Sequence, residues 1–185
     1  MASVVDICNK ALSLIGQEAI VSLDDDSPQA YACRTHWAPL RDEVLSDHSW
    51  NCATKRAVLG RLISTPAYGF KYYFQLPSDC LTVIETSPVV DFQVESGLLL
   101  CDTESLAIKY VRSEDDSTKY SPKLSAAFSY LLAAELAYQS TSSASLAEGF
   151  RGIGKEKILD AKATDSFEGK KREKRGSKLL SAKYR

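Results

Sequence analysis

Histidine is scarce in this chain and its cysteines never occur close together, which narrows the chemistry open to the protein. Only His36 and His48 are present, and neither belongs to an H-E-x-x-H motif or another compact ligand spacing, so a zinc hydrolase is not indicated. No C-x-x-C pair exists, so the sequence predicts neither a disulfide framework nor a thiolate metal site. We expect small buried thiols in a reducing compartment at all five cysteines: Cys8, Cys33, Cys52, Cys80 and Cys101.

Nucleotide-binding loops and long apolar runs are also missing. The chain has no G-x-S-x-G, Walker A or dinucleotide motif, and Gly149, Gly152 and Gly154 follow a helix-like stretch, whereas a dinucleotide fingerprint follows a strand. No apolar run approaches the roughly 18 residues that a membrane span requires, and the first residues lack a signal-peptide pattern. We therefore expect no nucleotide chemistry, no cofactor and no membrane partner, in a protein made in the cytoplasm.

Two sets of side chains leave an enzymatic interpretation open. His48 and Cys52 are four residues apart and form a conceivable Cys/His pair, but no orienting Asn or Asp can be assigned to them. Paired carboxylates, which glycoside hydrolysis requires, occur at residues 24–26, 42–43 and 114–116. Such clusters are common in soluble proteins, where loop acids are solvated and acids at the start of a helix stabilise its dipole. The sequence therefore assigns no catalytic residue.

The overall composition is that of a globular protein, with 44% hydrophobic and 25% charged residues among 185. The 23 Lys and Arg residues nearly balance the 24 Asp and Glu residues, but the two signs are unevenly placed. Residues 169–185 contain eight basic residues and one acid, so their net charge is +7. The other 168 residues contain 15 basic and 23 acidic residues, so their net charge is −8. A basic tail on an acidic body favours contact with nucleic acid, a membrane surface or an acidic protein, and a solubilising terminus is the alternative.

The candidate partner-binding residues are basic side chains of this tail and its apolar end. They are Lys170, Lys171, Arg172, Lys174, Arg175, Lys178, Leu179, Leu180 and Tyr184. The tail contains no nucleic-acid-reading motif and no interleaved aromatic residue apart from its penultimate tyrosine, so it supports at most nonspecific phosphate contact.

Helical periodicity predicts two helices in the first 49 residues. Ser3 and Asp6 resemble a capping box at the start of an apolar 3–4 spacing that ends at Gly16. Ser27 followed by Pro28, an N-cap before proline at the first helical position, opens a second helix to about residue 48. The apolar stripe of this second helix is typical of a helix that packs on other helices.

The pattern changes after residue 50, where β-branched and aromatic residues alternate and Gly and Pro interrupt the chain. A turn at Ser96-Gly97 indicates a hairpin. We expect a small antiparallel β lobe in which Trp50 locks the lobe to the second helix. The predicted strands are 54–58, 72–76, 81–86, 92–95, 98–102 and 106–111.

Two more helices are predicted after the lobe. Ser121-Pro122 repeats the cap pattern and opens a helix to about residue 139 that is apolar almost all round. Such a helix must be covered on most sides, either by helices of the same chain or by neighbouring subunits. A fourth helix is expected from about residue 144 to 166, and Gly149, Gly152 and Gly154 predict a bend in it.

These patterns together predict an α+β fold. A bundle of about four helices carries a small antiparallel β lobe between its second and third helices, and an extended basic C-terminal tail follows. We divide the chain into residues 1–49, the first two helices; 50–118, the inserted lobe; 119–168, the last two helices; and 169–185, the basic arm.

Several short blocks are informative through their order and spacing. They are ICNKALSLIG at 7–16, SLDDD at 22–26, AC at 32–33, LRDEVL at 40–45, HSWNCA at 48–53, YFQLPSDCL at 73–81, IKYV at 108–111 and an Ala/Leu-rich helix at 128–138. In this order they resemble the tail tubular protein A family of tailed phages, the head-to-tail adaptors between portal and tail nozzle. The resemblance spans nearly the whole chain and is weakest in the last seventeen residues.

The resemblance implies a helical bundle with an inserted β lobe, in a structural protein of the virion that is made in the host cytoplasm and located at the head-to-tail junction. It implies a ring homo-oligomer of about twelve copies that docks on the portal protein and carries the tail nozzle or next tail component. It implies no reaction and no cofactor.

On this interpretation residues 169–185 are an assembly arm, poorly ordered in an isolated subunit and fixed when it lies along an acidic neighbouring subunit or the portal. Nonspecific contact of the arm with DNA in the channel is the rival explanation. Two other classes of function remain open: a tail-associated glycan hydrolase, and a nucleic-acid-binding factor that uses the basic tail.

Overall fold

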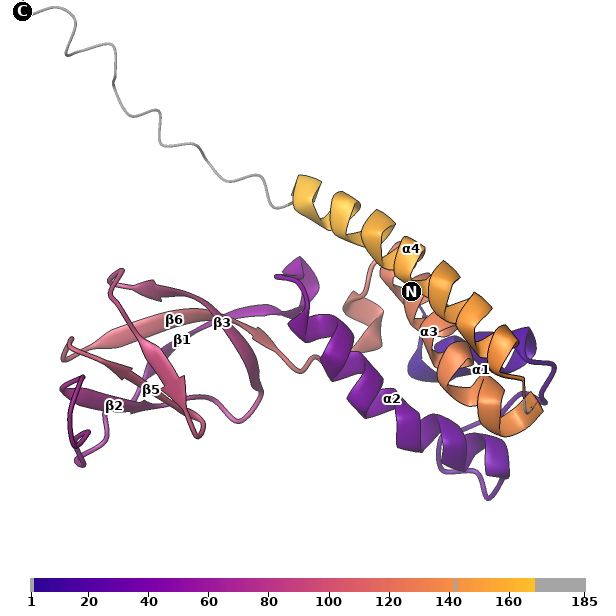
Figure 1. Cartoon of the computed structure of the whole chain (residues 1–185), viewed down its shortest axis with the longest axis horizontal. Coiled ribbons are helices and arrows are strands. Elements are labelled where there is room, and N and C mark those ends of the chain that lie inside the picture. Colours follow the sequence, from indigo (N-terminus) through magenta and orange to yellow (C-terminus); the bar gives the residue numbers. More distant parts are fainter. Residues whose placement is uncertain (1, 142, 169–185) are drawn as a thin grey trace, which may run out of the picture.

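The protein consists of a helical bundle and a β lobe that lie beside each other (Figure 1). The computed structural model describes residues 2–141 and 143–168. Its elements follow in the order α1 (Val4–Leu14), α2 (Pro28–Ser46), β1 (Thr54–Leu59), β2 (Tyr72–Gln75), β3 (Cys80–Ser87), β4 (Gln93–Glu95), β5 (Leu98–Cys101), β6 (Leu106–Arg112), α3 (Pro122–Thr141) and α4 (Ala144–Glu168). Two short 3-10 helices, η1 (Asn51–Ala53) and η2 (Ser117–Lys119), lie where the chain enters and leaves the lobe. The predicted α+β fold, with the lobe inserted between α2 and α3, is confirmed, and the predicted tail lies outside the described residues.

The first two helices begin at the residues that the sequence predicts. At the start of α1 the backbone amide of Asp6 donates to the Ser3 hydroxyl over 3.1 Å, and the Ser3 amide donates back to the Asp6 carboxylate over 2.8 Å. The Ser27 hydroxyl accepts from the amide of Ala30 over 3.2 Å at the start of α2. Gly16, just after α1, has a φ of +71°, a conformation that favours glycine at the end of a helix.

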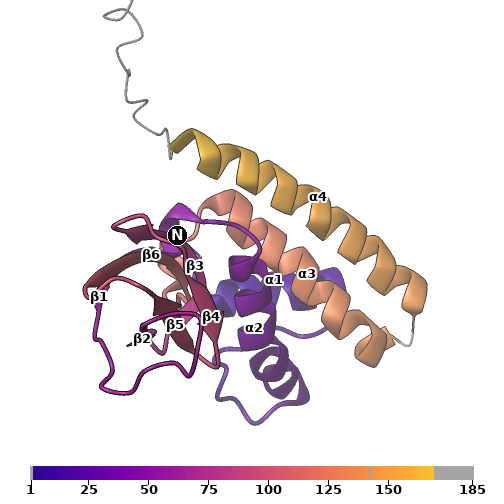
Figure 2. The same cartoon turned by 60° about the vertical axis from the view of Figure 1, so that its left-hand side comes forward.

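Helix α3 lies at the centre of the bundle, and α1, α2 and α4 all pack against it (Figure 2). Its side chains Phe128, Leu132 and Leu136 are fully buried. The ring of Trp37 on α2 lies 5.2 Å from that of Phe128, between the ring centroids. The helix that is apolar almost all round is therefore covered by helices of its own chain and does not require a neighbouring subunit for cover.

Helix α4 packs on α3 through small residues. Ala147, Gly154 and Ala161 are buried at intervals of seven residues, so they lie on one side of the helix. A Cβ atom on Gly154 would lie 2.6 Å from Cδ2 of Leu131, so the two helices are close at this point. The predicted bend at the glycines is wrong, because α4 runs straight and without interruption through all of them (Figures 1 and 2).

The lobe contains two three-stranded antiparallel sheets, with strand orders β1-β6-β3 and β2-β5-β4. An isolated bridge between Arg61 and Phe74 joins the end of β1 to β2. The predicted turn between β4 and β5 is present, because Ser96 and Gly97 both have positive φ, 50° and 78°. Phe74, with Tyr110 of β6, lies in a separate small core between the sheets.

Trp50 lies where the lobe meets the bundle. Its side chain is 1% exposed, and its ring nitrogen donates to the carbonyl of Val44, in the last turns of α2, over 3.0 Å. The same core cluster contains Leu45 of α2, Val111 of β6 and Phe128 of α3. The core of the bundle therefore extends into the proximal end of the lobe, with the tryptophan at the boundary as the sequence predicts.

Candidate interaction surfaces

All nine residues predicted to bind a partner belong to residues 169–185, which lie outside the described part of the chain. Their roles therefore stay predictions. The body from which this arm departs is described up to the end of α4, which lies near the C-terminal end of α2 (Figure 1).

The last turns of α4 are tied to the segment after α2 by polar contacts. The carboxylate of Asp165 accepts from the backbone amide of Asn51 over 3.1 Å and lies 3.3 Å from Nε2 of His48. One turn earlier, Nζ of Lys162 lies 2.5 Å from the carboxylate of Asp47. The last turns of α4 are thus held against the segment that joins α2 to the lobe.

The acidic clusters singled out in the sequence serve structural contacts. In the loop before α2, the Asp25 carboxylate accepts from the amides of Val21 and Ser22 over 2.8 and 3.1 Å. Asp24 lies 3.9 Å from Arg34 of α2. Through these contacts Asp24 and Asp25 hold the loop in its local conformation.

A second acidic cluster joins the lobe to α2 through a buried arginine. Arg41 is 8% exposed, pairs with Asp42 over 2.9 Å and also pairs with Asp115 in the segment after β6. The hydroxyl of Ser113 accepts from Arg41 over 2.6 Å and donates to Asp42 over 2.7 Å. A buried guanidinium needs several partners, and here they come from both parts of the molecule, so the network fixes the lobe on the bundle.

Glu114, only 2% exposed, is the most buried acid of this junction. Burial by itself would raise its pKa, but hydrogen bonds from Lys119, from the amide of Asp116 and from Arg112 outweigh burial and lower the pKa below its ordinary value. A general acid in glycoside hydrolysis needs a raised pKa. The buried carboxylate therefore lacks the property that a catalytic acid requires, and its contacts are those of a structural anion.

The conceivable Cys/His pair is also engaged in packing. The ring of His48 lies edge-on to that of Trp50, with centroids 4.8 Å apart. Burial first, and the nearby carboxylate of Asp165 second, raise the pKa of Cys52 to about 11. A thiol with such a pKa is protonated at neutral pH, whereas a cysteine nucleophile reacts as the thiolate.

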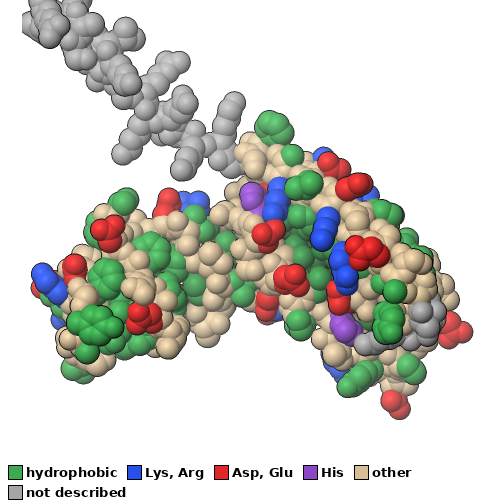
Figure 3. Space-filling model, in the orientation of Figure 1, with side chains coloured by type: hydrophobic (Ala, Val, Ile, Leu, Met, Phe, Trp, Pro, Cys, Tyr) green, Lys and Arg blue, Asp and Glu red, His purple; other side chains and the backbone are tan. Residues whose placement is uncertain are grey.

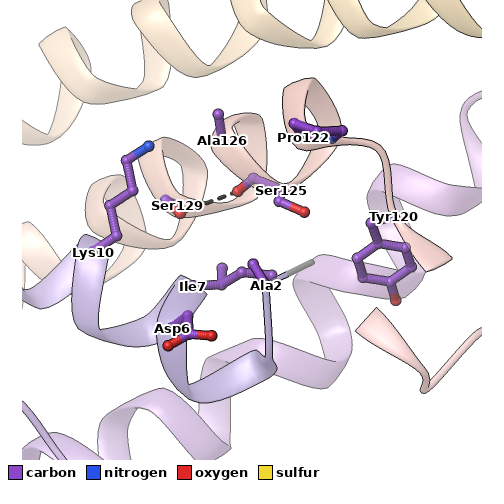
Figure 4. A pocket seen from close by; sticks show the side chains of 9 residues that line it. All are labelled: Ala2, Asp6, Ile7, Lys10, Tyr120, Pro122, Ser125, Ala126 and Ser129. Carbon is purple, nitrogen blue, oxygen red and sulfur yellow. Dashed lines mark hydrogen bonds between the residues drawn. The ribbon is translucent and has the colours of Figure 1, made fainter. Parts of the chain in front are cut away.

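A shallow hollow of about 320 Å³ lies between α1 and the start of α3 (Figure 4). Asp6 and Lys10 border it from α1, and the hydroxyl groups of Ser125 and Ser129 from α3. Hydrogen bonds from the Ser3 backbone and hydroxyl lower the pKa of Asp6, and Ser129 donates to the carbonyl of Ser125. The hollow thus contains neither a poised base nor a hydroxyl paired with one.

Neither a metal site nor a membrane-spanning helix is found in the described part of the chain. Within residues 2–141 and 143–168, no three His, Cys, Asp or Glu side chains come together as metal ligands would. Across the same part of the chain, no helix combines the length and apolar character needed to cross a bilayer.

Exposed apolar side chains lie on the β lobe as well as on the bundle (Figure 3). Tyr68, in the long loop between β1 and β2, is 90% exposed, and Ile63 in the same loop is fully exposed. The other exposed apolar residues of the lobe are Val58, Val89, Phe92 and Val94. Apolar groups gathered on one part of a surface are typical of contact sites for other proteins.

No protein-family model matches the chain, and neither does any curated protein. The family resemblance therefore depends on the order of the sequence blocks alone.

Proposed function

We propose that this chain is a structural head-to-tail adaptor of a tailed-phage virion. It forms a ring that docks on the portal protein and carries the tail nozzle or the next tail component. The observation that carries the proposal is the order of the sequence blocks between residues 7 and 138, because these blocks run through both the bundle and the lobe. The bundle with a lobe inserted between α2 and α3 is also the architecture that the resemblance implies.

The lobe supplies the surface on which an adaptor would carry the next component. Two of its most exposed apolar residues, Ile63 and Tyr68, lie in the loop between β1 and β2. Interfaces between proteins are enriched in aromatic and large apolar residues of this kind. The network around Arg41 and Glu114 holds this surface in a fixed position relative to the bundle, as a platform requires.

The charge distribution supports a role in assembly. The body carries −8 and residues 169–185 carry +7, so a subunit and the arm of another copy attract each other. A ring also needs two different surfaces that meet head to tail, and an acidic body with a basic arm provides such a pair. The carboxylates of the junction, which a glycan hydrolase would need, are engaged with Arg41, Arg112 and Lys119.

The decisive experiment measures the mass of the purified full chain alone and after mixing with its portal protein. We expect a defined complex in which the portal gains a ring of about twelve copies. A mixture that contains only free chain and free portal contradicts the proposal. Glycan cleavage lost on changing one carboxylate would instead indicate the hydrolase, and DNA affinity that falls steeply with salt would indicate the nucleic-acid-binding factor.

A further inference from the structure

The side of α4 that faces away from α3 is exposed along its whole length. Within the described part of the chain α4 packs principally on α3, and it lies at the outer edge of the bundle in both views (Figures 1 and 2). Seven of the exposed residues recur three and four positions apart, so these seven form one stripe of that side. The stripe consists of Leu146, Gly149, Ile153, Glu156, Asp160, Ala163 and Phe167.

The stripe is acidic at its centre and apolar at its ends. Glu156 and Asp160 are exposed, and among the described residues neither carboxylate forms an ion pair. Phe167 is 82% exposed near one end, and Leu146 and Ile153 are exposed toward the other. The stripe therefore offers negative charge flanked by apolar contact surface.

Three of the four basic side chains of α4 contact partners on α3 or just after α2, and the fourth, Lys155, is exposed. Arg151 pairs with Glu135 over 3.1 Å, Lys157 lies over the ring of Tyr130, and Lys162 pairs with Asp47. Lys155 borders a groove between α4 and the end of α2 that Glu43 also lines. None of the four forms an ion pair with Glu156 or Asp160 within the described part of the chain, so these two carboxylates can still pair with an added cation. A basic segment with apolar residues would complement that side.

We propose that this stripe of α4 is the docking site of the chain's own residues 169–185 before assembly. The segment begins directly after Glu168, the last residue of α4, so it is present at the stripe at a high effective concentration. It carries +7, against the two unpaired carboxylates of the stripe, and it ends in an apolar group that contains Leu179 and Leu180.

The lengths of the two partners also agree. Along α4, with a rise of about 1.5 Å per residue, Asp160 and Glu156 lie about 10 and 16 Å back from Phe167, and Leu146 lies about 32 Å back. An extended chain advances about 3.3 Å per residue. After a reversal at Gly169, the basic run 170–175 would cover about the first 17 Å, and Leu179 would reach about 30 Å, near Leu146.

An arm held on its own helix cannot lie on the portal at the same time. If the chain is the adaptor proposed above, the arm must therefore leave α4 when the ring forms. The stripe thus attaches an arm that the sequence alone predicts to be free in the isolated subunit. The arm leaves α4 only when a partner binds it more strongly than α4 does, so its basic residues become accessible only in the presence of that partner.

Photo-crosslinking in the full chain tests this docking. An Ala163→p-benzoylphenylalanine variant places a photoreactive group on the stripe, and a Tyr31→p-benzoylphenylalanine variant places it at an exposed position of α2. A dilute mixture of ¹⁴N- and ¹⁵N-labelled chains is irradiated, digested at acidic residues and analysed by mass spectrometry. We expect links from position 163 to residues 169–185 within single chains, and at least about fivefold fewer such links from position 31.

Charge reversal provides the matched control. Glu156→Lys with Asp160→Lys should lower the yield of links from position 163 by about fivefold or more, as should high salt. The same reversal at the exposed acids Glu18 and Asp26 should leave the yield unchanged. Links that join differently labelled chains would overturn the proposal, because the segment would then belong to a second copy. A yield from position 163 no higher than that from position 31 would also overturn the docking proposal. Ring formation is measured separately, by mixing the same preparation with the portal. Rings that form without arm docking would overturn the docking proposal alone and leave the adaptor function standing.

Discussion

A Cβ atom on Gly154 would lie 2.6 Å from Cδ2 of Leu131, so the glycine is what allows α4 to lie this close to α3. The backbone amide of Leu131 is also near, 3.3 Å from the same position. Either the leucine side chain or the whole helix would have to move to admit a methyl group. By contrast, a Cβ atom on Gly149 or Gly152 would meet nothing within 4 Å, because both glycines are exposed.

The three glycines of α4 should therefore respond differently to alanine. Gly154→Ala is expected to lower the free energy of unfolding by about 1–3 kcal/mol through overpacking against Leu131. Gly149→Ala and Gly152→Ala should each raise it by about 0.5–1 kcal/mol, because alanine is the better helix former. Urea denaturation measures all three. An equal gain in stability from every substitution would show that α4 is not closely packed at Gly154.

The same glycines show where reasoning from the sequence fails. Helix propensity treats Gly149, Gly152 and Gly154 alike, so it predicts a weak point at each of them. Which one faces α3 depends on the rotation of α4 about its axis, and that is set by packing with residues distant in the sequence. The helix starts were predictable because the capping residues Ser3 and Ser27 act on amides only three residues away.

In the lobe, likewise, only the local features were predictable. The strands were predictable from the alternation of apolar and polar side chains. The turn was predictable because a tight hairpin needs residues that tolerate positive φ, as Ser96 and Gly97 have here. The strand order β1-β6-β3 depends on pairing between segments that are distant in the sequence, such as Thr54 with Val111, and alternation does not specify such pairing. The contact between Arg41 and Asp115 was missed for the same reason, and the partner-binding arm stays a prediction because it lies outside the described residues.

Trp50 provides a test of the connection between lobe and bundle. Trp50→Ala removes a side chain that is 1% exposed and breaks the hydrogen bond to the carbonyl of Val44. We expect a loss of about 3–5 kcal/mol in the free energy of unfolding. Tyr31→Ala, at an aromatic side chain that is 64% exposed, should change it by less than about 0.5 kcal/mol. An unchanged melting temperature for Trp50→Ala would show that the tryptophan does not hold the two parts together.

Glu114 should make the fold sensitive to acid. Its pKa is lowered in the folded chain from an ordinary value of 4.5, so the stability that its charged form provides is present above about pH 4.5 and is lost as the pH falls through the lower, folded value. Glu114→Gln leaves Arg112 and Lys119 without this anion. The difference in unfolding free energy between the natural chain and Glu114→Gln should therefore be larger at pH 7 than at pH 3. Equal differences at the two pH values would exclude a stabilising charge on Glu114.

The exposed residues of the long lobe loop should matter for the next tail component and not for the portal. Ile63→Ser combined with Tyr68→Ser removes two large apolar groups from the surface without touching the core. We expect portal rings to form normally and the following tail component to bind at least about tenfold more weakly, as measured by sedimentation of the mixed proteins. Val21→Ser, at an equally exposed apolar residue of the bundle, is the control. If all the variants bind the tail component alike, the lobe loop is not the platform.

Two changes in the basic arm, residues 169–185, distinguish contact with a protein partner from contact with DNA. Deletion of residues 169–185 removes both the charges and the apolar end, whereas Leu179→Ser with Leu180→Ser removes only the apolar end and keeps the charge of +7. An arm that anchors in a groove of a protein partner needs both parts, but an arm that lies on DNA needs only its charges. We expect both changes to weaken assembly with the portal while the melting temperature stays within about 2 °C of the natural chain, because the arm lies beyond α4. Normal assembly of the double serine variant together with failure of the deletion would indicate DNA contact, and normal assembly of the truncated chain would show that the arm is dispensable.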